Sequence, residues 1–397
     1  MKILVADKLS NQILTALRNL GLEVRSEPDR KADELPQIIG DADIIIVRSK
    51  KVTAKTIEAA ANLSLIIRAG AGVDTIDVAA ANARGIYVAN CPGKNADAVA
   101  ELAIGLLIAA DRRIVEATLA LREGKWLKGE FGKARGLKGR TLGLIGFGTI
   151  AQAVARRALG LEMKVLVWSR SLTLAQAAAA GVAHAATPLD VAKAADAVSV
   201  HVAATADTKQ LINEAFFAAL KPGAIFINTA RGDVVQTAAL KAAIASGKLR
   251  VGVDVFEGEP AGSEAVFADT DLAKMVSCTP HVGASTDQAS EAIADEAVRI
   301  VKVYQETGTP PNAVNICGRS PARYALKVRH FDRVGVLASI LAGLRRDTVN
   351  VEEMQNTIFD GAKAACCSLS ISSEPSAETM AQLRADPNIL QVTLTAR

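Results

Sequence analysis

Residues 140–170 read RTLGLIGFGTIAQAVARRALGLEMKVLVWSR, and the fold follows from this stretch. Its first part, 141–146, is apolar and rich in residues that favour strands. A GxGxxA turn comes next, and residues 149–159 then carry apolar side chains at the 3.6-residue spacing of a helix. A second apolar run occupies 164–168. The order strand, glycine turn, helix, strand is typical of a dinucleotide-binding unit.

Each residue of the glycine turn has a physical role in that interpretation. Gly146 permits the tight bend, and Gly148 has no Cβ, so a pyrophosphate can approach the backbone. Thr149 and Ile150 open the helix, whose N-terminal N–H groups point at the phosphates. The small Ala151 lets helix and strand pack closely. A tight strand-to-helix turn without a ligand is the alternative.

The end of the second strand bears on the choice of cofactor. An Asp or Glu usually stands there and holds the ribose hydroxyls of NAD, but this chain has Ser169 and Arg170. A hydroxyl beside a guanidinium suits a 2′-phosphate. We therefore expect NAD or NADP as cofactor, with use of NADP suspected. The alternative is that Arg170 stacks on the adenine and NAD still binds.

Composition limits the class of protein. A chain of 397 residues is expected to form two or three domains. The formal net charge is +4 and the cations are dispersed, which argues against nucleic acid as a partner. No apolar run reaches the roughly 18 residues of a membrane span, and no secretion signal is visible. The five cysteines lack metal-ligand spacing, so we expect reduced thiols, no metal and a cytoplasmic location.

Strands and helices alternate through most of the chain, which predicts an α/β fold with two Rossmann-like parallel-sheet domains. The first, a substrate domain, covers 1–92 and is completed by a returning segment at 286–312. The second, the dinucleotide-binding domain, covers 93–285. A long, mostly apolar helix at 95–113 is expected to be buried between domains or in a subunit interface.

The tail has a different pattern. Residues 307–323 contain Pro310, Pro311 and Pro321 and are expected to form a linker. The remainder, 323–397, is expected to have the order β-α-β-β-α-β, which is that of a ferredoxin-like domain.

Three side chains after strands of the second domain point to hydride transfer. Arg231 can clamp a carboxylate, His281 can take a hydroxyl proton, and Glu259 can orient the histidine and favour its charged form. Each residue alone has an ordinary structural explanation. Together, downstream of a dinucleotide turn, they predict oxidation or reduction of a 2-hydroxy acid.

The chain resembles the D-isomer-specific 2-hydroxyacid dehydrogenases. The motifs that carry this resemblance are Val47–Ser49, Arg68–Asp74, the glycine turn, Asn228–Gly232, Asp254–Pro260 and Pro280–Gly283. It implies that Arg231, Glu259 and His281 are catalytic. It also implies cofactor contacts from Thr229, Ala230, Asp254 and Gly283.

The resemblance further implies a substrate site in the first domain. Backbone N–H groups of Gly70, Ala71 and Gly72 would hold the substrate carboxylate. Arg48 and Arg68, with Ser49, would meet a substrate phosphate, since two guanidinium forks suit that charge. An exposed charge at a strand end is the alternative for Arg48. Trp126 and Lys128 resemble a segment that reaches the active site of a neighbouring subunit.

The tail resembles an ACT domain, a regulatory module that binds amino acids. His330 and Asp332 resemble its ligand loop, and Asn350 its second contact. Asp332 stands where serine-inhibited relatives have Asn, and Thr348 replaces a Gly. Serine feedback is therefore a hypothesis, with subunit pairing alone as the alternative.

We expect an enzyme that oxidises a small phosphorylated 2-hydroxy acid, D-3-phosphoglycerate, in the first step of serine biosynthesis. A homo-oligomer, dimer or tetramer, with a possible amino-acid effector is expected. One alternative is an NADPH-dependent glyoxylate or hydroxypyruvate reductase. Another is a dinucleotide-sensing regulatory scaffold without turnover.

Overall fold

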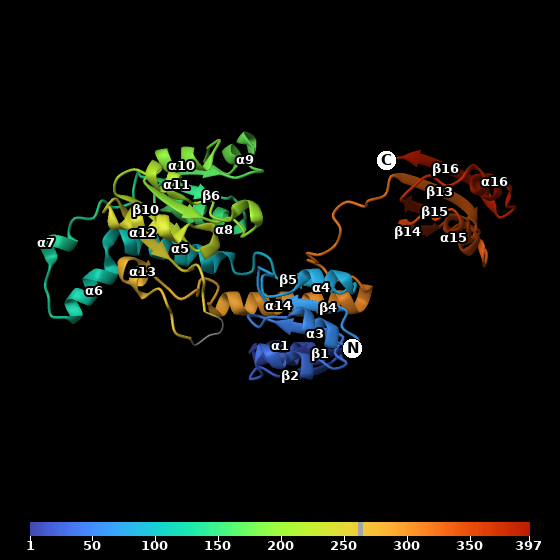
Figure 1. Ribbon diagram of the computed structural model, residues 1–397, viewed down its shortest axis with the longest axis horizontal. Coiled ribbons are helices and arrows are strands. Elements are labelled where there is room, and N and C mark those ends of the chain that lie inside the picture. The colour runs from blue at the N-terminus through green and yellow to red at the C-terminus, as the bar shows by residue number, and fades with distance from the viewer. Residues whose placement is uncertain (261–264) are drawn as a thin grey trace. The chain divides into compact units, whose positions relative to one another are not determined.

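The computed structural model describes residues 1–260 and 265–397 and divides the chain into two compact units, Met1–Asn315 and Ile316–Arg397. The first unit holds two parallel sheets and the second an antiparallel sheet (Figure 1). The α/β class with Rossmann-like parallel sheets is confirmed, together with a small additional C-terminal domain.

The first sheet has five parallel strands in the order β2-β1-β3-β4-β5. The strands are β1 (Lys2–Val5), β2 (Glu23–Ser26), β3 (Ile44–Val47), β4 (Leu65–Arg68) and β5 (Tyr87–Asn90). The helices around this sheet are α1 (Asn11–Asn19), α2 (Leu35–Ile38), α3 (Ala54–Ala59), α4 (Val78–Ala83) and α14 (Asp287–Thr307). A 3₁₀ turn at Ala32–Glu34 precedes α2.

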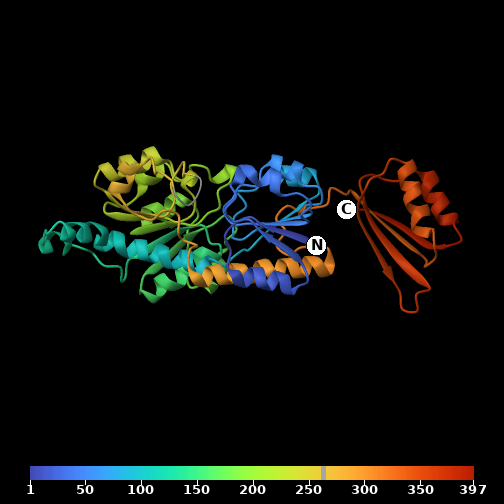
Figure 2. The same cartoon turned by 90° about the horizontal axis from the view of Figure 1, so that it is seen from below.

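A late segment of the chain covers one face of this sheet. Buried side chains of α1 and α14 form one cluster with alternate residues of β1, β3 and β4. Figure 2 displays α14 (orange) running beside α1 (dark blue) on that face. The opposite face carries a second cluster with α2, α3 and α4. Both faces of the strands are therefore apolar, as expected for a buried parallel sheet.

The second sheet has seven parallel strands in the order β12-β11-β10-β9-β6-β7-β8. The strands are β6 (Thr141–Ile145), β7 (Lys164–Trp168), β8 (Ala183–His184), β9 (Ala197–Val200), β10 (Ala224–Asn228), β11 (Leu249–Val253) and β12 (Ser277–Cys278). The helices are α5 (Ala96–Arg112), α6 (Ile114–Arg122), α7 (Lys128–Phe131), α8 (Thr149–Gly160), α9 (Leu174–Ala179), α10 (Pro188–Ala194), α11 (Glu214–Ala219), α12 (Thr237–Ala245) and α13 (Thr270–Met275).

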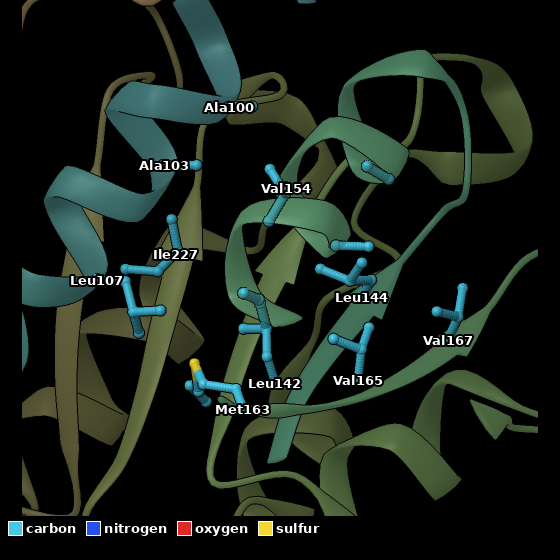
Figure 3. Packing of buried hydrophobic residues seen from close by; sticks show 14 of the residues in the cluster. Ala100, Ala103, Leu107, Leu142, Leu144, Val154, Met163, Val165, Val167 and Ile227 are labelled. Carbon is cyan, nitrogen blue, oxygen red and sulfur yellow. The ribbon is translucent and has the colours of Figure 1, made fainter. Parts of the chain in front are cut away.

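The apolar helix α5 packs directly on this sheet. In Figure 3, Ala103 and Leu107 of α5 lie near Ile227 of β10, and Val154 of α8 lies over Leu142 of β6. Helices α10 to α13 contribute to the cluster on the other face. The near-continuous hydrophobicity of α5 thus reflects burial against the sheet and α8 within this unit.

Several short elements were not expected from the sequence. Strand β2 is polar because it is an edge strand that pairs with β1 alone. Helix α10 buries only Val191 and Ala192, which leaves little apolar periodicity to detect. Strand β8, α13 and α7 are likewise short elements that the sequence analysis did not predict.

The second unit is a four-stranded antiparallel sheet in the order β14-β15-β13-β16. Its elements are β13 (Tyr324–Phe331), α15 (Val336–Arg346), β14 (Val351–Ile358), β15 (Ala364–Ile371), α16 (Ala377–Ala385) and β16 (Ile389–Ala396). The sequential order is the predicted β-α-β-β-α-β. Both helices pack on one face, where Ile340 of α15 lies in one buried cluster with Leu326 and Val328 of β13.

Candidate active site

The loop after β10 presents Arg231 at the carboxyl edge of the seven-stranded sheet. The Asn228 side chain fixes this loop, because its Oδ1 accepts from Ala230 N (3.0 Å) and its Nδ2 donates to Arg231 O (3.0 Å). Asn228 is buried, whereas Arg231 is partly exposed. The backbone of Arg231 is thereby held while its guanidinium stays accessible.

Gly232 allows this loop to touch the one after β11. A Cβ at Gly232 would collide with the Phe256 carbonyl, so only glycine permits the two backbones to approach so closely. In the second loop, Phe256 N donates to Glu259 Oε1 at 2.9 Å. The contact between the loops brings Arg231 and Glu259 to the same edge of the sheet.

Asp254 organises the loop that carries His281. Its buried carboxylate accepts hydrogen bonds from Thr279 Oγ1 (2.6 Å), Val282 N (2.8 Å) and Gly283 N (2.8 Å). The Asp254 carbonyl accepts from His281 N at 2.8 Å. His281 has a left-handed backbone with φ 52°, a strained conformation that these bonds compensate. The structure thus gives Asp254 a supporting role beyond the cofactor contact expected from the sequence.

His281 and Glu259 form the closest pair of titratable groups in the site. His281 Nδ1 lies 2.6 Å from Glu259 Oε2. The hydrogen bond to Glu259 raises the pKa of His281, although partial burial of the ring opposes this. Burial alone would raise the pKa of Glu259, but His281 and the Phe256 amide outweigh it and the pKa is lowered. The pair therefore favours imidazolium beside carboxylate.

Arg231 also meets a residue of the first sheet. Its Nη2 lies 3.4 Å from Asp74 Oδ1, in the loop after β4. A Cβ at Gly72 would collide with the ends of both side chains, so a larger residue there would displace one or both of them. Burial would raise the pKa of Asp74, but the charges of Arg231 and Arg68 contribute to lowering it. Asp74 was included in a motif in the sequence analysis but was assigned no role in the site.

Arg48 stands on a loop that a buried aspartate holds. Asp7 Oδ2 accepts from the N–H groups of Arg48 (2.6 Å), Ser49 (3.0 Å) and Lys50 (3.0 Å). These bonds use the backbone of Ser49 and leave its exposed side chain available. Asp7 was not identified from the sequence either, although an acidic residue after the first strand is the signal that could have found it.

Arg68 folds back over Gly70, where a Cβ would collide with its guanidinium. Burial lowers the pKa of Arg68, Asp74 opposes this, and the charges of Arg231 and Arg48 add to the lowering. The Arg68 Nε is buried and has no partner among the described residues. The guanidinium groups of Arg48 and Arg231 therefore lie near enough to that of Arg68 to affect its pKa, and Asp74 contacts Arg231. An excess of guanidinium groups over carboxylates favours an anionic ligand.

The 70–72 loop retains fewer free donors than expected. The Gly70 N–H donates to Arg68 O at 2.8 Å. The Ala71 and Gly72 N–H groups have no partner in the chain segments that the structure describes. Only these two amides are available to a substrate carboxylate, so the expected role of the Gly70 amide needs correction.

The glycine turn is shaped for a ligand. Gly146 has φ 98° and closely approaches the carbonyl of His201 at the end of β9, with 2.6 Å from its hypothetical Cβ to that oxygen. A Cβ at Gly148 would meet nothing within 4 Å, so the space in front of the N-terminus of α8, which Thr149 and Ile150 begin, is open. Thr229 Oγ1 is buried without a hydrogen-bond partner among the described residues. The open glycine turn and an unpaired hydroxyl at the same edge of the sheet fit a dinucleotide.

The residues expected near the adenosine end lie after β7. Ser169 is partly buried and Arg170 is exposed. Arg170 Nη1 makes a 3.1 Å ion pair with Asp207, which belongs to a 3₁₀ turn at Ala206–Thr208 after β9. The Arg170 guanidinium is therefore already paired with Asp207. A 2′-phosphate would either displace the Asp207 carboxylate or bind beside it.

Other expected residues are not brought to this edge. Lys128 begins α7 and Trp126 precedes it, in an exposed segment beyond α6. In the second unit, His330 is buried, with Nδ1 bonded to Phe331 O (2.8 Å) and Nε2 3.2 Å from Asn356 Oδ1. A buried ring of this kind supports the loop and has no surface left for an effector, which corrects the role expected for it.

The two remaining effector candidates are accessible. Asp332 is exposed, and its backbone N–H donates to Lys363 O at 3.1 Å. The side chain of Asn350 is also exposed, and its Nδ2 donates to Glu352 Oε1 at 2.9 Å.

Asn95 is a further polar group that sequence reasoning missed. It precedes α5, and its Oδ1 is buried without a partner among the described residues. Gly93, two residues earlier, approaches the Thr149 methyl group, with 3.5 Å from its hypothetical Cβ. The sequence feature that could have identified Asn95 is its position as a polar residue where the chain passes from the first sheet to the second.

The described residues lack two further kinds of feature. No group of three or more His, Cys, Asp or Glu side chains there is arranged to hold a metal ion. None of the helices in the described segments combines the length and the apolar character needed to cross a membrane.

Known proteins resemble this chain in sequence and in fold. A sequence model of the D-isomer specific 2-hydroxyacid dehydrogenase NAD-binding domain matches residues 104–283. A hydroxypyruvate reductase of Thermotoga maritima is 43% identical over 305 residues, which are 76% of this chain and 96% of that protein. A D-3-phosphoglycerate dehydrogenase of Archaeoglobus fulgidus is 38% identical over 355 residues. The matched region is 86% of this chain and 65% of that protein.

A solved structure of similar fold is the NAD⁺-bound 3-phosphoglycerate dehydrogenase of Entamoeba histolytica. It is 28% identical and superimposes with a TM-score of 0.67 over 80% of this chain and 99% of that one.

Proposed function

This chain belongs to the D-isomer specific 2-hydroxyacid dehydrogenase family, and we propose that it oxidises D-3-phosphoglycerate to 3-phosphohydroxypyruvate. The observation that carries the choice of substrate is the convergence of Arg48, Arg68 and Arg231 at one site. A substrate with both a carboxylate and a phosphate would satisfy three guanidinium groups. A substrate with a carboxylate alone supplies no second anionic group for Arg48 and Arg68.

The chain's own residues account for binding and proton transfer. Arg231 binds the substrate carboxylate and the oxygen at C2, assisted by the amides of Ala71 and Gly72. His281 takes the proton of the C2 hydroxyl through Nε2, since its Nδ1 faces Glu259. Glu259 stabilises the imidazolium that results. NAD or NADP, when bound, accepts the hydride from C2.

The dinucleotide would lie on the glycine turn. Gly146, Gly148 and the first N–H groups of α8 hold the pyrophosphate, and Thr229 offers its unpaired hydroxyl. Ser169 and Arg170 lie where an adenosine 2′-phosphate would bind, which supports use of NADP alongside NAD.

We assign the substrate domain to 1–92 with 286–312, the dinucleotide domain to 93–285 and an ACT-like domain to 323–397. Helix α6 contains no buried residue and exposes Leu119 and Leu121, followed by Trp126 at 76% exposure. Such a row of apolar side chains is typical of a partner surface, and a second copy of this chain is the partner we propose. Asp332 and Asn350 are the candidate contacts for an amino-acid effector.

The competing enzymatic function is reduction of hydroxypyruvate or glyoxylate. The Thermotoga maritima relative carries the name hydroxypyruvate reductase, and the Ser169–Arg170 pair suits the NADPH that reductive enzymes use. The two functions differ in the need for a phosphate. We therefore compare kcat/KM for phosphohydroxypyruvate, hydroxypyruvate and glyoxylate in the reductive direction. Preference for phosphohydroxypyruvate supports the proposal, and preference for either unphosphorylated acid supports the alternative.

A dinucleotide-sensing scaffold without turnover is the alternative of another class. Replacing His281 by Asn separates the two. An enzyme loses turnover and retains cofactor binding, whereas a scaffold has no turnover to lose.

A further inference from the structure

A cavity of about 350 Å³ lies away from the active site, between the end of α5, the start of β11 and α7. Arg250, which lines it, is the second residue of β11, while Asp254 of the active site follows the last. Four residues span roughly 13 Å along a strand. The cavity therefore opens at the amino edge of the seven-stranded sheet, opposite the dinucleotide turn.

Positive charge dominates the wall of this cavity. Four cations line it, namely Arg112, Arg113, Lys133 and Arg250, and two carboxylates, Asp111 and Glu130. Counting the lining alone, the formal charge is four minus two, or +2.

Both carboxylates are already paired. Asp111 Oδ1 accepts from Arg140 Nη1 at 2.8 Å in a buried ion pair, and its Oδ2 accepts from Gly136 N at 3.0 Å. Glu130 Oε1 accepts from Arg113 Nη1 at 3.0 Å. Neither carboxylate is therefore free to neutralise the remaining cations.

Three of the four cations have charges that no carboxylate among the described residues balances in an ion pair. Within the described parts of the chain, Arg112, Lys133 and Arg250 take part in no ion pair. Arg250 Nη1 donates to Asp111 O at 2.6 Å, where the negative end of the α5 dipole offsets part of its charge. A guanidinium has five N–H donors, so that single bond leaves Arg250 with capacity for a ligand.

The wall also includes a strained residue. Arg113 joins α5 to α6 with a left-handed φ of 51°, and its guanidinium lies 4.7 Å from the centre of the Phe131 ring. The Arg113 side chain therefore lies against α7, and both Arg113 and Phe131 line the cavity.

From the excess of cations, the polar lining and the small volume, we propose that this cavity binds a small dianion, either a phosphate or a dicarboxylate. At 350 Å³ it is near the lower limit of ligand pockets, which suits a compact anion better than a nucleotide. The site is independent of the catalytic residues, none of which lines it. A purely structural account, in which these cations only cap α5 and anchor the segment before β6, predicts no ligand.

Calorimetric titration of the full chain tests the site. Inorganic phosphate and, separately, malonate are titrated into a chain carrying Arg48→Ala, which weakens phosphate binding at the active site. The cavity variant adds Arg112→Ala and Lys133→Ala, both at exposed positions. The matched control adds Arg122→Ala and Lys125→Ala, an exposed pair of the same charge that lies on the same segment outside the cavity.

We expect at least one probe to bind, with affinity reduced about tenfold or more in the cavity variant and changed less than about twofold in the control. If the cavity variant binds only phosphate more weakly, the cavity is a phosphate site. If it binds only malonate more weakly, the cavity is a dicarboxylate site. The proposal is overturned if neither probe binds. It is also overturned if the cavity variant and the control bind the probes with the same affinity, whether that affinity is unchanged or reduced. An unchanged thermal unfolding midpoint verifies that the variants are folded.

Discussion

His281 Nδ1 lies 2.6 Å from Glu259 Oε2, and this contact joins two loops that follow different strands of the seven-stranded sheet. It directs the other ring nitrogen, Nε2, away from Glu259. The hydrogen bond is also the largest cause of the raised pKa of His281. The contact therefore sets both the orientation and the proton affinity of the proposed base.

Turnover should depend on pH through His281. Oxidation needs neutral His281, so its rate should rise as the pH passes the raised pKa of that residue, while reduction should fall over the same range. Glu259→Gln removes the cause of the raised pKa, and both profiles should shift to lower pH. In this variant the His281 imidazolium lacks a carboxylate partner, so kcat should also fall by about 10²-fold. Glu257→Gln, at a neighbouring exposed position, should leave both profiles unchanged.

Phosphate recognition is tested by Arg48→Ala. Loss of a charge-assisted contact should raise KM for D-3-phosphoglycerate about tenfold to a hundredfold, with little change in kcat. KM for hydroxypyruvate, which has no phosphate, should stay the same. Lys55→Ala is the control, since that lysine lies on α3 in the same domain. Equal effects on both substrates would mean that Arg48 acts on the fold of the loop and not on the phosphate.

Asp207 should influence the choice of cofactor. Its carboxylate lies 3.1 Å from Arg170, so it competes with a 2′-phosphate for the guanidinium and repels that phosphate. Asp207→Asn should increase the ratio of kcat/KM for NADP over NAD, and Arg170→Ala should decrease it. The expected change is about threefold to tenfold, because both side chains are exposed. Steady-state kinetics with each cofactor gives the ratio, and Asp190→Asn serves as control. A ratio that neither variant alters would separate Arg170 from cofactor choice.

Acid stability should depend on Glu296 of α14. Its buried carboxylate accepts from Arg299 Nη2 (2.6 Å) and Asn312 Nδ2 (2.7 Å) and lies 3.3 Å from Lys94 Nζ. Its hydrogen bond with Arg299 is the largest cause that lowers the pKa of Glu296 to about 2. The lowered pKa stabilises the fold above the ordinary value of 4.5, and this contribution disappears as the pH falls toward 2.

The linked free energy is roughly 3 kcal/mol at neutral pH. Chemical unfolding at several pH values should therefore reveal a destabilisation in Glu296→Gln that is large at pH 7 and much smaller near pH 2. Glu291→Gln, at an exposed position of the same helix, should cost little at either pH. A penalty for Glu296→Gln that does not vary with pH would contradict the assigned role of its charge.

Local patterns in the sequence were sufficient to predict much of the fold. The glycine turn at Gly146 and the apolar strands were recognised because turn chemistry and strand burial act over a few residues. The edge strand β2 was missed because half-exposed strands lack an apolar run. His330 was assigned to an effector loop because sequence position alone does not tell which face of β13 its ring occupies.

Partners far apart in the sequence could not be predicted. Asp74 and Arg231 are 157 residues apart, and only the meeting of two loops brings them within 3.4 Å. The same is true of Asp7, whose carboxylate holds a loop more than 40 residues later. The proposed catalytic residues were singled out by their chemistry, whereas the residues that position them depend on tertiary contacts.

Burial of a reactive group is another property that only the structure supplies. Cys91 follows β5 near the proposed site, but it is fully buried, and burial raises the pKa of its thiol to about 11. The buried Cys91 thiol packs against α14, where its Sγ lies 3.7 Å from Ile293 O. We therefore assign Cys91 to the core of the first sheet.

The most direct test of the account is the initial rate of D-3-phosphoglycerate oxidation at alkaline pH, measured in parallel with NAD and NADP. We expect turnover with at least one cofactor and a loss of about 10²-fold or more in His281→Asn, with cofactor binding retained. Turnover with NAD alone would leave the function intact and refute the use of NADP. Absence of oxidation with both cofactors, together with no reduction of phosphohydroxypyruvate, would contradict the central claim.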